Sequence, residues 1–130
     1  ESGCTAKDVI RKVQEAVGPM ENSVYMRGDR IEKALSIVLE AKELVPQMKA
    51  VDFHDLIACH EAEAMVLSAE MFFRAAAMRQ ESRGWFLRED YPEMDNKNWL
   101  KWIIVKNVDG EMTFTTEDVP IEKYPVQPAV

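Results

Sequence analysis

The longest stretch without a helix-breaking residue constrains the fold most, and it runs from Phe53 to about Ser82. It contains neither glycine nor proline, the two residues that most disfavour the interior of a helix. Asp52 is a favourable N-cap, and Asp55 three residues later suits the positive end of the helix dipole. At about 1.5 Å per residue such a helix would extend about 45 Å, which predicts a mainly helical chain.

Apolar side chains of this predicted helix lie on more than one of its faces. They are Leu56, Ala58, Ala62, Met65, Val66, Ala69, Phe72, Phe73, Ala76 and Ala77. Because alanine is small, neighbouring helices can approach such a helix closely on several sides. We therefore expect it to be the central element of a small bundle.

Two shorter helices are predicted upstream. The first begins at Thr5, whose spacing to Asp8 is typical of a capping box, and it ends at the Gly-Pro pair that follows Val17. After a connector, the second runs from about Asp29 to Val45 with an apolar stripe on one face, and a proline follows it.

The residue pattern changes after the long helix. Residues 99–105 and 112–116 are rich in β-branched and aromatic side chains, and the Asp109-Gly110 pair between them favours a hairpin turn. Three prolines in residues 120–128 favour an extended tail over a helix.

The expected fold is mainly α, with the whole chain 1–130 forming a single domain. An antiparallel, spectrin-repeat-like three-helix bundle is predicted at about 5–83. A corner, a β-hairpin or irregular extension, and the proline-containing tail are predicted at about 84–130.

The charge and the apolar pattern exclude several kinds of partner. A net charge of −7 and a pI near 4.9 disfavour binding to nucleic acid or to an anionic membrane surface. No run approaches the roughly 20 apolar residues of a membrane helix, so we expect no direct membrane insertion. Cys4 and Cys59 have no CxxC spacing, which predicts two free thiols in a reducing cytoplasm.

The sequence contains no set of residues that indicates catalysis or metal binding. It has neither a glycine-rich phosphate loop nor an HExxH motif. His54 and His60 lack the Glu-x-x-His pairs of helical di-iron sites. Cys59 and His60 point about 100° apart on a helix, so they do not form a nucleophile and its base. No catalytic, cofactor-binding or metal-binding residue is therefore predicted in this chain.

Charged and aromatic side chains are concentrated between the long helix and the predicted hairpin. Arg83 suits a helix C-terminus, and Gly84 fits the left-handed residue that often follows a helix. Arg88 can pair bidentately with a carboxylate such as Glu81 or Asp90. The segment is either a stapled corner between helix and strand or a binding surface, and we favour the corner.

Three short motifs follow one another in this region. They are Glu81-Ser82-Arg83-Gly84, Arg88-Glu89-Asp90-Tyr91-Pro92 and Asn98-Trp99-Leu100-Lys101. With the helices before it, the series resembles the C-terminal domain of the succinate dehydrogenase/fumarate reductase flavoprotein family, which includes L-aspartate oxidase and the adenylylsulfate reductase α subunit. Many dehydrogenases of that family have a histidine two residues after the glycine, where this chain has Phe86. The subfamily therefore stays open among the fumarate reductase, aspartate oxidase and adenylylsulfate reductase types.

The resemblance implies a non-catalytic piece of a larger FAD-dependent oxidoreductase of the fumarate reductase/succinate dehydrogenase type. A start at Glu1 rather than at Met agrees with an excised piece. An upstream flavin-binding domain of the same chain would hold FAD, and an iron–sulfur subunit would be a second partner, in the cytoplasm or at its membrane face. The role implied for this piece is structural, at a domain or subunit interface, with candidate residues Glu81, Arg83, Gly84, Arg88, Asp90 and Trp99.

A free-standing helical module for protein interaction is the alternative. Such a bundle has no reason to contain the series from Glu-Ser-Arg-Gly to Asn-Trp. The size and the flavin content of the native protein would distinguish the two.

Overall fold

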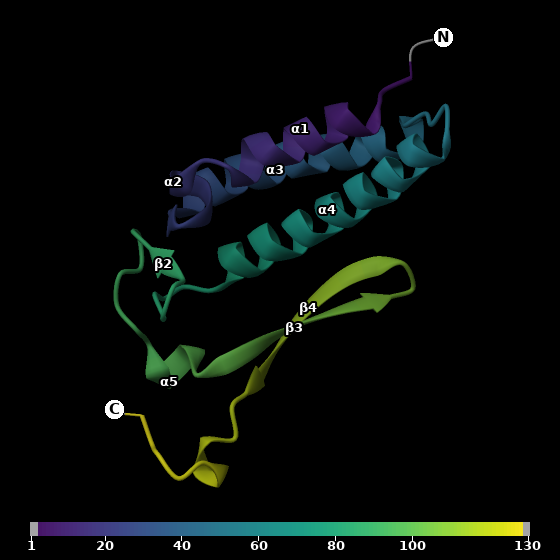
Figure 1. The fold of residues 1–130 in the computed structure, drawn as a ribbon. Coiled ribbons are helices and arrows are strands. Elements are labelled where there is room, and N and C mark those ends of the chain that lie inside the picture. Colours follow the sequence, from purple (N-terminus) through teal and green to yellow (C-terminus); the bar gives the residue numbers. More distant parts are fainter. Residues whose placement is uncertain (1–2, 129–130) are drawn as a thin grey trace.

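Three helices form the body of the molecule. The computed structural model describes residues 3–128, in which α1 (Ala6–Val17), α3 (Gly28–Leu44) and α4 (Phe53–Met78) pack side by side (Figure 1). Consecutive members of this trio run in opposite directions. The predicted antiparallel three-helix bundle is thereby confirmed.

The core lies between the inward faces of these helices. Phe73 is its largest fully buried side chain, and small residues around it let the helices approach closely. The buried apolar cluster comprises Ala6, Val9, Val13, Ala16, Met26, Ile31, Ala34, Val38, Ala41, Ala62, Val66, Ala69, Phe73 and Ala76.

The helix starts follow the local signals in the sequence. Thr5 and Asp8 accept hydrogen bonds from each other's backbone amides, which confirms the capping box of α1. Asp52 accepts a bond of 2.8 Å from the amide of Asp55 and so caps α4. At its C-terminal end, α3 is followed by a 3-10 turn, η1 (Val45–Gln47), which contains the proline that stops the helix.

Unexpected structure fills the connector between α1 and α3. It contains the short helix α2 (Met20–Ser23) and the strand β1 (Tyr25–Met26). The strand pairs in parallel with β2 (Leu87–Arg88). Pairings of two residues carry no periodic pattern, so the sequence did not indicate this link.

The C-terminal end of α4 corrects the predicted boundary at Ser82. The helix ends at Met78, and Arg79 already has extended dihedral angles of φ −80° and ψ 117°. The guanidinium of Arg88 donates to the carbonyl oxygens of Ala76 at 2.8 Å and Arg79 at 3.1 Å. A side chain that lies 12 residues away from Ala76 in sequence therefore satisfies the carbonyls at this helix end.

The predicted hairpin is confirmed after a further short helix, α5 (Asn96–Trp99). Strands β3 (Lys101–Val108) and β4 (Glu111–Asp118) pair antiparallel. Asp109 and Gly110 have φ angles of 52° and 87°, the left-handed pair that a two-residue hairpin turn requires.

Two details after the corner differ from expectation. Trp99 ends α5 instead of beginning a strand, because Asp95 caps that turn by accepting from the amide of Asn98. The tail contains one 3-10 turn, η2 (Ile121–Lys123), which begins after Pro120, so the tail is not extended throughout.

No helix in the described part of the chain combines the length and the apolar character needed to cross a membrane. Cys4 and Cys59 are both free thiols and are both partly buried.

Candidate functional site

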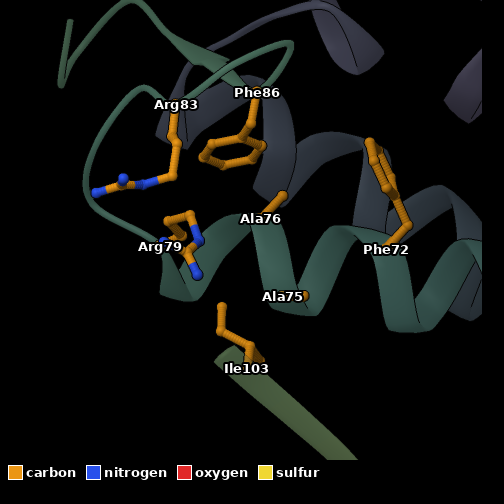
Figure 2. A pocket seen from close by; sticks show the side chains of 7 residues that line it. All are labelled: Phe72, Ala75, Ala76, Arg79, Arg83, Phe86 and Ile103. Carbon is orange, nitrogen blue, oxygen red and sulfur yellow. The ribbon is translucent and has the colours of Figure 1, made fainter. Parts of the chain in front are cut away.

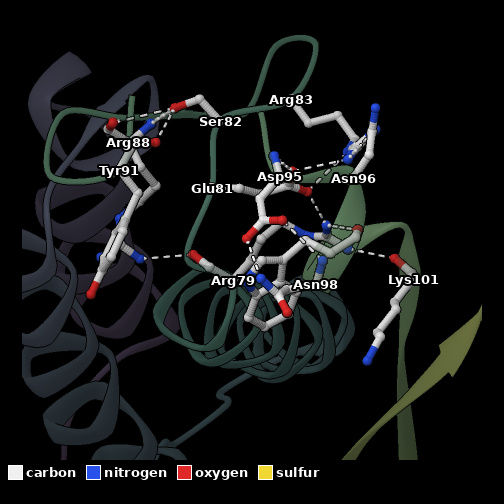
Figure 3. A network of polar contacts seen from close by, with 11 residues as sticks. Arg79, Glu81, Ser82, Arg83, Arg88, Tyr91, Asp95, Asn96, Asn98 and Lys101 are labelled. Carbon is white, nitrogen blue, oxygen red and sulfur yellow. Dashed lines mark hydrogen bonds and ion pairs between the residues drawn. The ribbon is translucent and has the colours of Figure 1, made fainter. Parts of the chain in front are cut away.

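The predicted candidate residues gather where α4, the β1–β2 pair and the start of the hairpin meet (Figure 3). We call residues 79–99 the corner. Its polar side chains form two clusters, one around Glu81 and one around Arg88.

Glu81 is a fully buried carboxylate that accepts hydrogen bonds from several neighbouring donors. Arg83 donates to it through Nε at 2.9 Å and through Nη2 at 3.0 Å. The amide of Asp95 adds a bond of 2.9 Å, and the Nη1 of Arg79 completes the set. Burial raises the pKa of the Glu81 carboxyl, but the bonds from Arg83, Asp95 and Arg79 outweigh that effect and leave the pKa below its usual value.

Arg79 connects this cluster to the hairpin. Its guanidinium donates to the carbonyl oxygens of Trp99 at 3.0 Å and Lys101 at 2.7 Å. It also lies over the Trp99 ring, 5.3 Å from the ring centroid, in cation–π contact. The buried carboxylate thus fixes an arginine that holds the end of α4 against the first residue of β3.

Arg88 organises the second cluster, where it is almost completely buried. It binds Asp90 bidentately, with Nε–Oδ1 and Nη2–Oδ2 distances of 2.7 and 2.6 Å. Of the two partners that the sequence allowed for Arg88, Asp90 is therefore the one in the structure, and Glu81 pairs with other arginines.

Further bonds tie this second cluster to the bundle. Asp90 accepts from the amide of Gly28, the first residue of α3, at 2.9 Å. Ser82 accepts from the amide of Arg88 at 2.8 Å and donates to the carbonyl of Tyr91 at 2.8 Å. The corner therefore joins the N-terminus of α3, the C-terminus of α4 and the hairpin.

Gly84 lies in a tight turn, which corrects its predicted place directly after the helix. Its φ of +59° confirms the left-handed conformation. The turn is closed by reciprocal backbone bonds of 2.8 and 3.0 Å between Arg83 and Phe86. Trp85, at its tip, is 95% exposed. Trp85 was not among the residues predicted from the sequence, because no local pattern distinguishes an exposed tryptophan from a buried one.

An open apolar hollow of about 310 Å³ lies beside the corner (Figure 2). Its lining consists of Phe72, Ala75, Ala76, Arg79, Arg83, Phe86 and Ile103. This set contains no carboxylate, histidine, hydroxyl or thiol, and both arginines already bind Glu81. The hollow therefore has the chemistry of a packing surface.

Metal-binding geometry is absent from residues 3–128, where no three His, Cys, Asp or Glu side chains gather around a common point. His60 has Glu63 as its neighbour, with an Nδ1–Oε2 distance of 3.9 Å, and both side chains are exposed.

The Asp90 cluster predicts a loss of stability in acid. The bonds from Arg88 are the main reason that the pKa of Asp90 falls from 3.8 to about 2. Because the pKa is lower in the folded state, the stabilisation is complete above pH 3.8 and is lost as the pH falls toward 2. Because Asp90 is partly exposed and solvent screens its ion pair, we expect this carboxylate to account for about 1 kcal/mol of the free energy of unfolding lost over that range.

Urea unfolding of the wild type and of Asp90→Asn between pH 2 and 6 would test this, because the amide cannot titrate. The expected result is a smaller acid-induced loss in the variant. Equal losses in the two proteins would contradict it.

The family described as fumarate reductase flavoprotein C-term matches residues 13–130. An uncharacterised FAD-dependent oxidoreductase of Methanocaldococcus jannaschii is 33% identical over 84 residues, which cover 65% of this chain and 15% of the relative. The mitochondrial succinate dehydrogenase flavoprotein subunit of Oryza sativa is 27% identical over 105 residues, which cover 77% of this chain and 17% of that subunit.

Solved structures share the fold. A variant of Escherichia coli quinol fumarate reductase matches with a TM-score of 0.87 and 24% identity, over 100% of this chain and 23% of that one. Adenylylsulfate reductase from Archaeoglobus fulgidus matches with a TM-score of 0.81 and 22% identity, over 90% of this chain and 20% of the reductase chain. The chain thus spans less than a quarter of the length of these relatives.

Proposed function

The chain belongs to the family of fumarate reductase flavoprotein C-terminal domains, and on that basis we propose that it is the non-catalytic helical domain of a larger FAD-dependent oxidoreductase. The parent protein would be of the fumarate reductase/succinate dehydrogenase type. In this proposal the 130 residues form a single domain, and an upstream flavin-binding domain and an iron–sulfur subunit are the partners, in the cytoplasm or at its membrane face.

The observation that carries this proposal is a family match over 118 of 130 residues. Two features of this piece argue against an FAD site within it. Arg79 and Arg83 already donate hydrogen bonds to Glu81 and neighbouring groups. The sequence also contains no glycine-rich phosphate loop. Flavin chemistry would therefore belong to the upstream part of the parent.

The decisive experiment is to isolate the native protein with an antibody to this domain and to measure polypeptide mass and visible flavin absorbance. We expect a yellow polypeptide several times larger than the 14.9 kDa of this chain. A colourless native chain of 14.9 kDa would overturn the proposal.

The corner is proposed to be part of the contact with the flavin-binding domain. Glu81, Arg83, Gly84, Arg88, Asp90 and Trp99 would set its shape. That shape supports a turn whose tip is the exposed Trp85. A tryptophan presented on a rigid turn is typical of the anchors that contribute most to protein interfaces.

Trp85→Ala in the parent tests this role more cleanly than Arg83→Ala. Arg83 also binds Glu81 and Asn96, so its loss would weaken the corner itself. Replacing an exposed ring should leave this domain intact, yet cost the parent about 2 kcal/mol of domain contact. The expected readouts are a lower melting temperature and less bound flavin. Unchanged values would remove Trp85 and the corner from the interface.

A further inference from the structure

Helix α4 is apolar on two opposite faces. Its inward face buries Ala62, Val66, Ala69, Phe73 and Ala76. Successive residues of a helix are about 100° apart, so a second apolar set projects from the other side. We call this set the outer stripe, and it consists of Phe53, Leu56, Ile57, Ala64 and Leu67. The exposed His60 lies between Ile57 and Ala64 on the same face.

The outer stripe is exposed along its length. Phe53 is 86% exposed and Leu67 is 51% exposed, and the members between them are exposed as well. Their spacing of three, four and seven residues is that of a face that packs against a neighbouring element. A surface helix normally has polar residues on this side, so the stripe has the composition of a contact surface without a partner among residues 3–128.

We propose that the outer stripe docks onto an apolar surface, bordered by Lys or Arg, in the upstream part of the parent chain. This inference rests on the proposed function and adds a second contact to the corner. The relatives are four to seven times longer than the matched segment. A parent of that length supplies the missing surface within the same polypeptide.

Charge supports a basic border on the partner. Residues 53–67 include Glu61 and Glu63 and contain no Lys or Arg, whereas Asp55 lies on the inward side of the helix, beside Lys7 and Lys49. Glu61 and Glu63 are exposed beside the stripe. Opposite charges at the rim of an apolar contact direct the correct docking orientation.

The same charges disfavour a second copy of this chain as the occupant. A symmetric dimer places the centre of the stripe of one copy against the centre of the other. Glu61 and Glu63 lie near that centre, so four carboxylates would meet there. Like charges placed together at an interface cost several kcal/mol.

The position of the stripe fits a partner that also contacts the corner. The hairpin β3–β4 lies on the side of α4 that faces away from α1 and α3 (Figure 1). Ile103 of this hairpin lines the hollow next to the corner. The outer stripe is opposite the buried face of α4 and therefore lies on the same side of that helix as the hairpin.

The test is thiol labelling in the full-length parent. Leu67→Cys places a thiol in the stripe, and Glu43→Cys places a matched thiol on the exposed side of α3. Peptide-level mass spectrometry separates both positions from Cys4 and Cys59. We expect Cys at position 67 to react at least tenfold more slowly than Cys at position 43 in the native parent, and equally fast in denaturant.

A second arm tests the charge argument. Glu61→Lys combined with Glu63→Lys is expected to raise the labelling rate at position 67 severalfold at low salt. Protection that this double variant leaves unchanged would overturn the basic border. Protection that rises with protein concentration would assign the stripe to a second copy.

The flavin content separates failure of this inference from failure of the proposed function. Free reaction at position 67 in a parent that still carries flavin would overturn the docking inference alone. Absence of flavin would count against the proposed function instead.

Discussion

Replacing Glu81 with alanine is expected to lower the free energy of unfolding of this chain by about 3–5 kcal/mol, the usual cost of removing one partner from a buried ion pair. The carboxylate is fully buried and holds Arg79 and Arg83 together with the amide of Asp95. Without it, two guanidinium groups in one crowded site would lose their main acceptor and repel each other. The bonds from Arg79 to the hairpin would be lost or weakened with them.

Urea unfolding followed by far-UV circular dichroism would measure this effect. Glu63→Ala is the matched control, because the same side chain is exposed there and its removal should cost less than about 0.5 kcal/mol. If the two variants were equally stable, the Glu81 cluster would not hold the corner together.

Phe73→Ala is expected to cost about 3–5 kcal/mol, because truncation of a buried phenylalanine removes its apolar burial and leaves a cavity. Phe73 is 0% exposed at the centre of the bundle core. Its ring also contacts Phe72 edge-on, with 5.1 Å between the centroids.

The neighbouring residue provides the control for this prediction. Phe72→Ala removes an identical side chain that is 40% exposed, and the same edge-on contact is lost in either variant. The difference between the two unfolding midpoints therefore reports the burial of position 73. A cost for Phe72→Ala as large as that for Phe73→Ala would mean that the core is not centred on Phe73.

Local signals predicted the elements whose causes lie within a few residues. The caps at Thr5 and Asp52 and the Asp109-Gly110 turn each act over a few residues, and the glycine-free stretch after Phe53 is a property of one continuous segment. Their helices and the hairpin were placed correctly for that reason. The motif series also located the corner, because it marked which residues belong together before their contacts were known.

The errors involve contacts between segments that are distant in sequence. The end of α4 depends on Arg88, which bonds to Ala76 from across the corner. The pairing of Arg88 with Asp90 is local, but the third group that fixes it, the amide of Gly28, lies 62 residues before Asp90. Helix periodicity and capping rules contain no information about such contacts.

The bond between Asp90 and Gly28 has a consequence for the order of folding. A contact that closes a loop of 62 residues forms at a considerable entropic cost unless intervening structure has already brought its ends together. Here α3 and α4 are that intervening structure, so we expect the corner to lock only after both helices have docked. A nascent or damaged chain with an incomplete bundle would then present no ordered turn at Trp85, and only correctly folded copies of the domain would be competent for assembly.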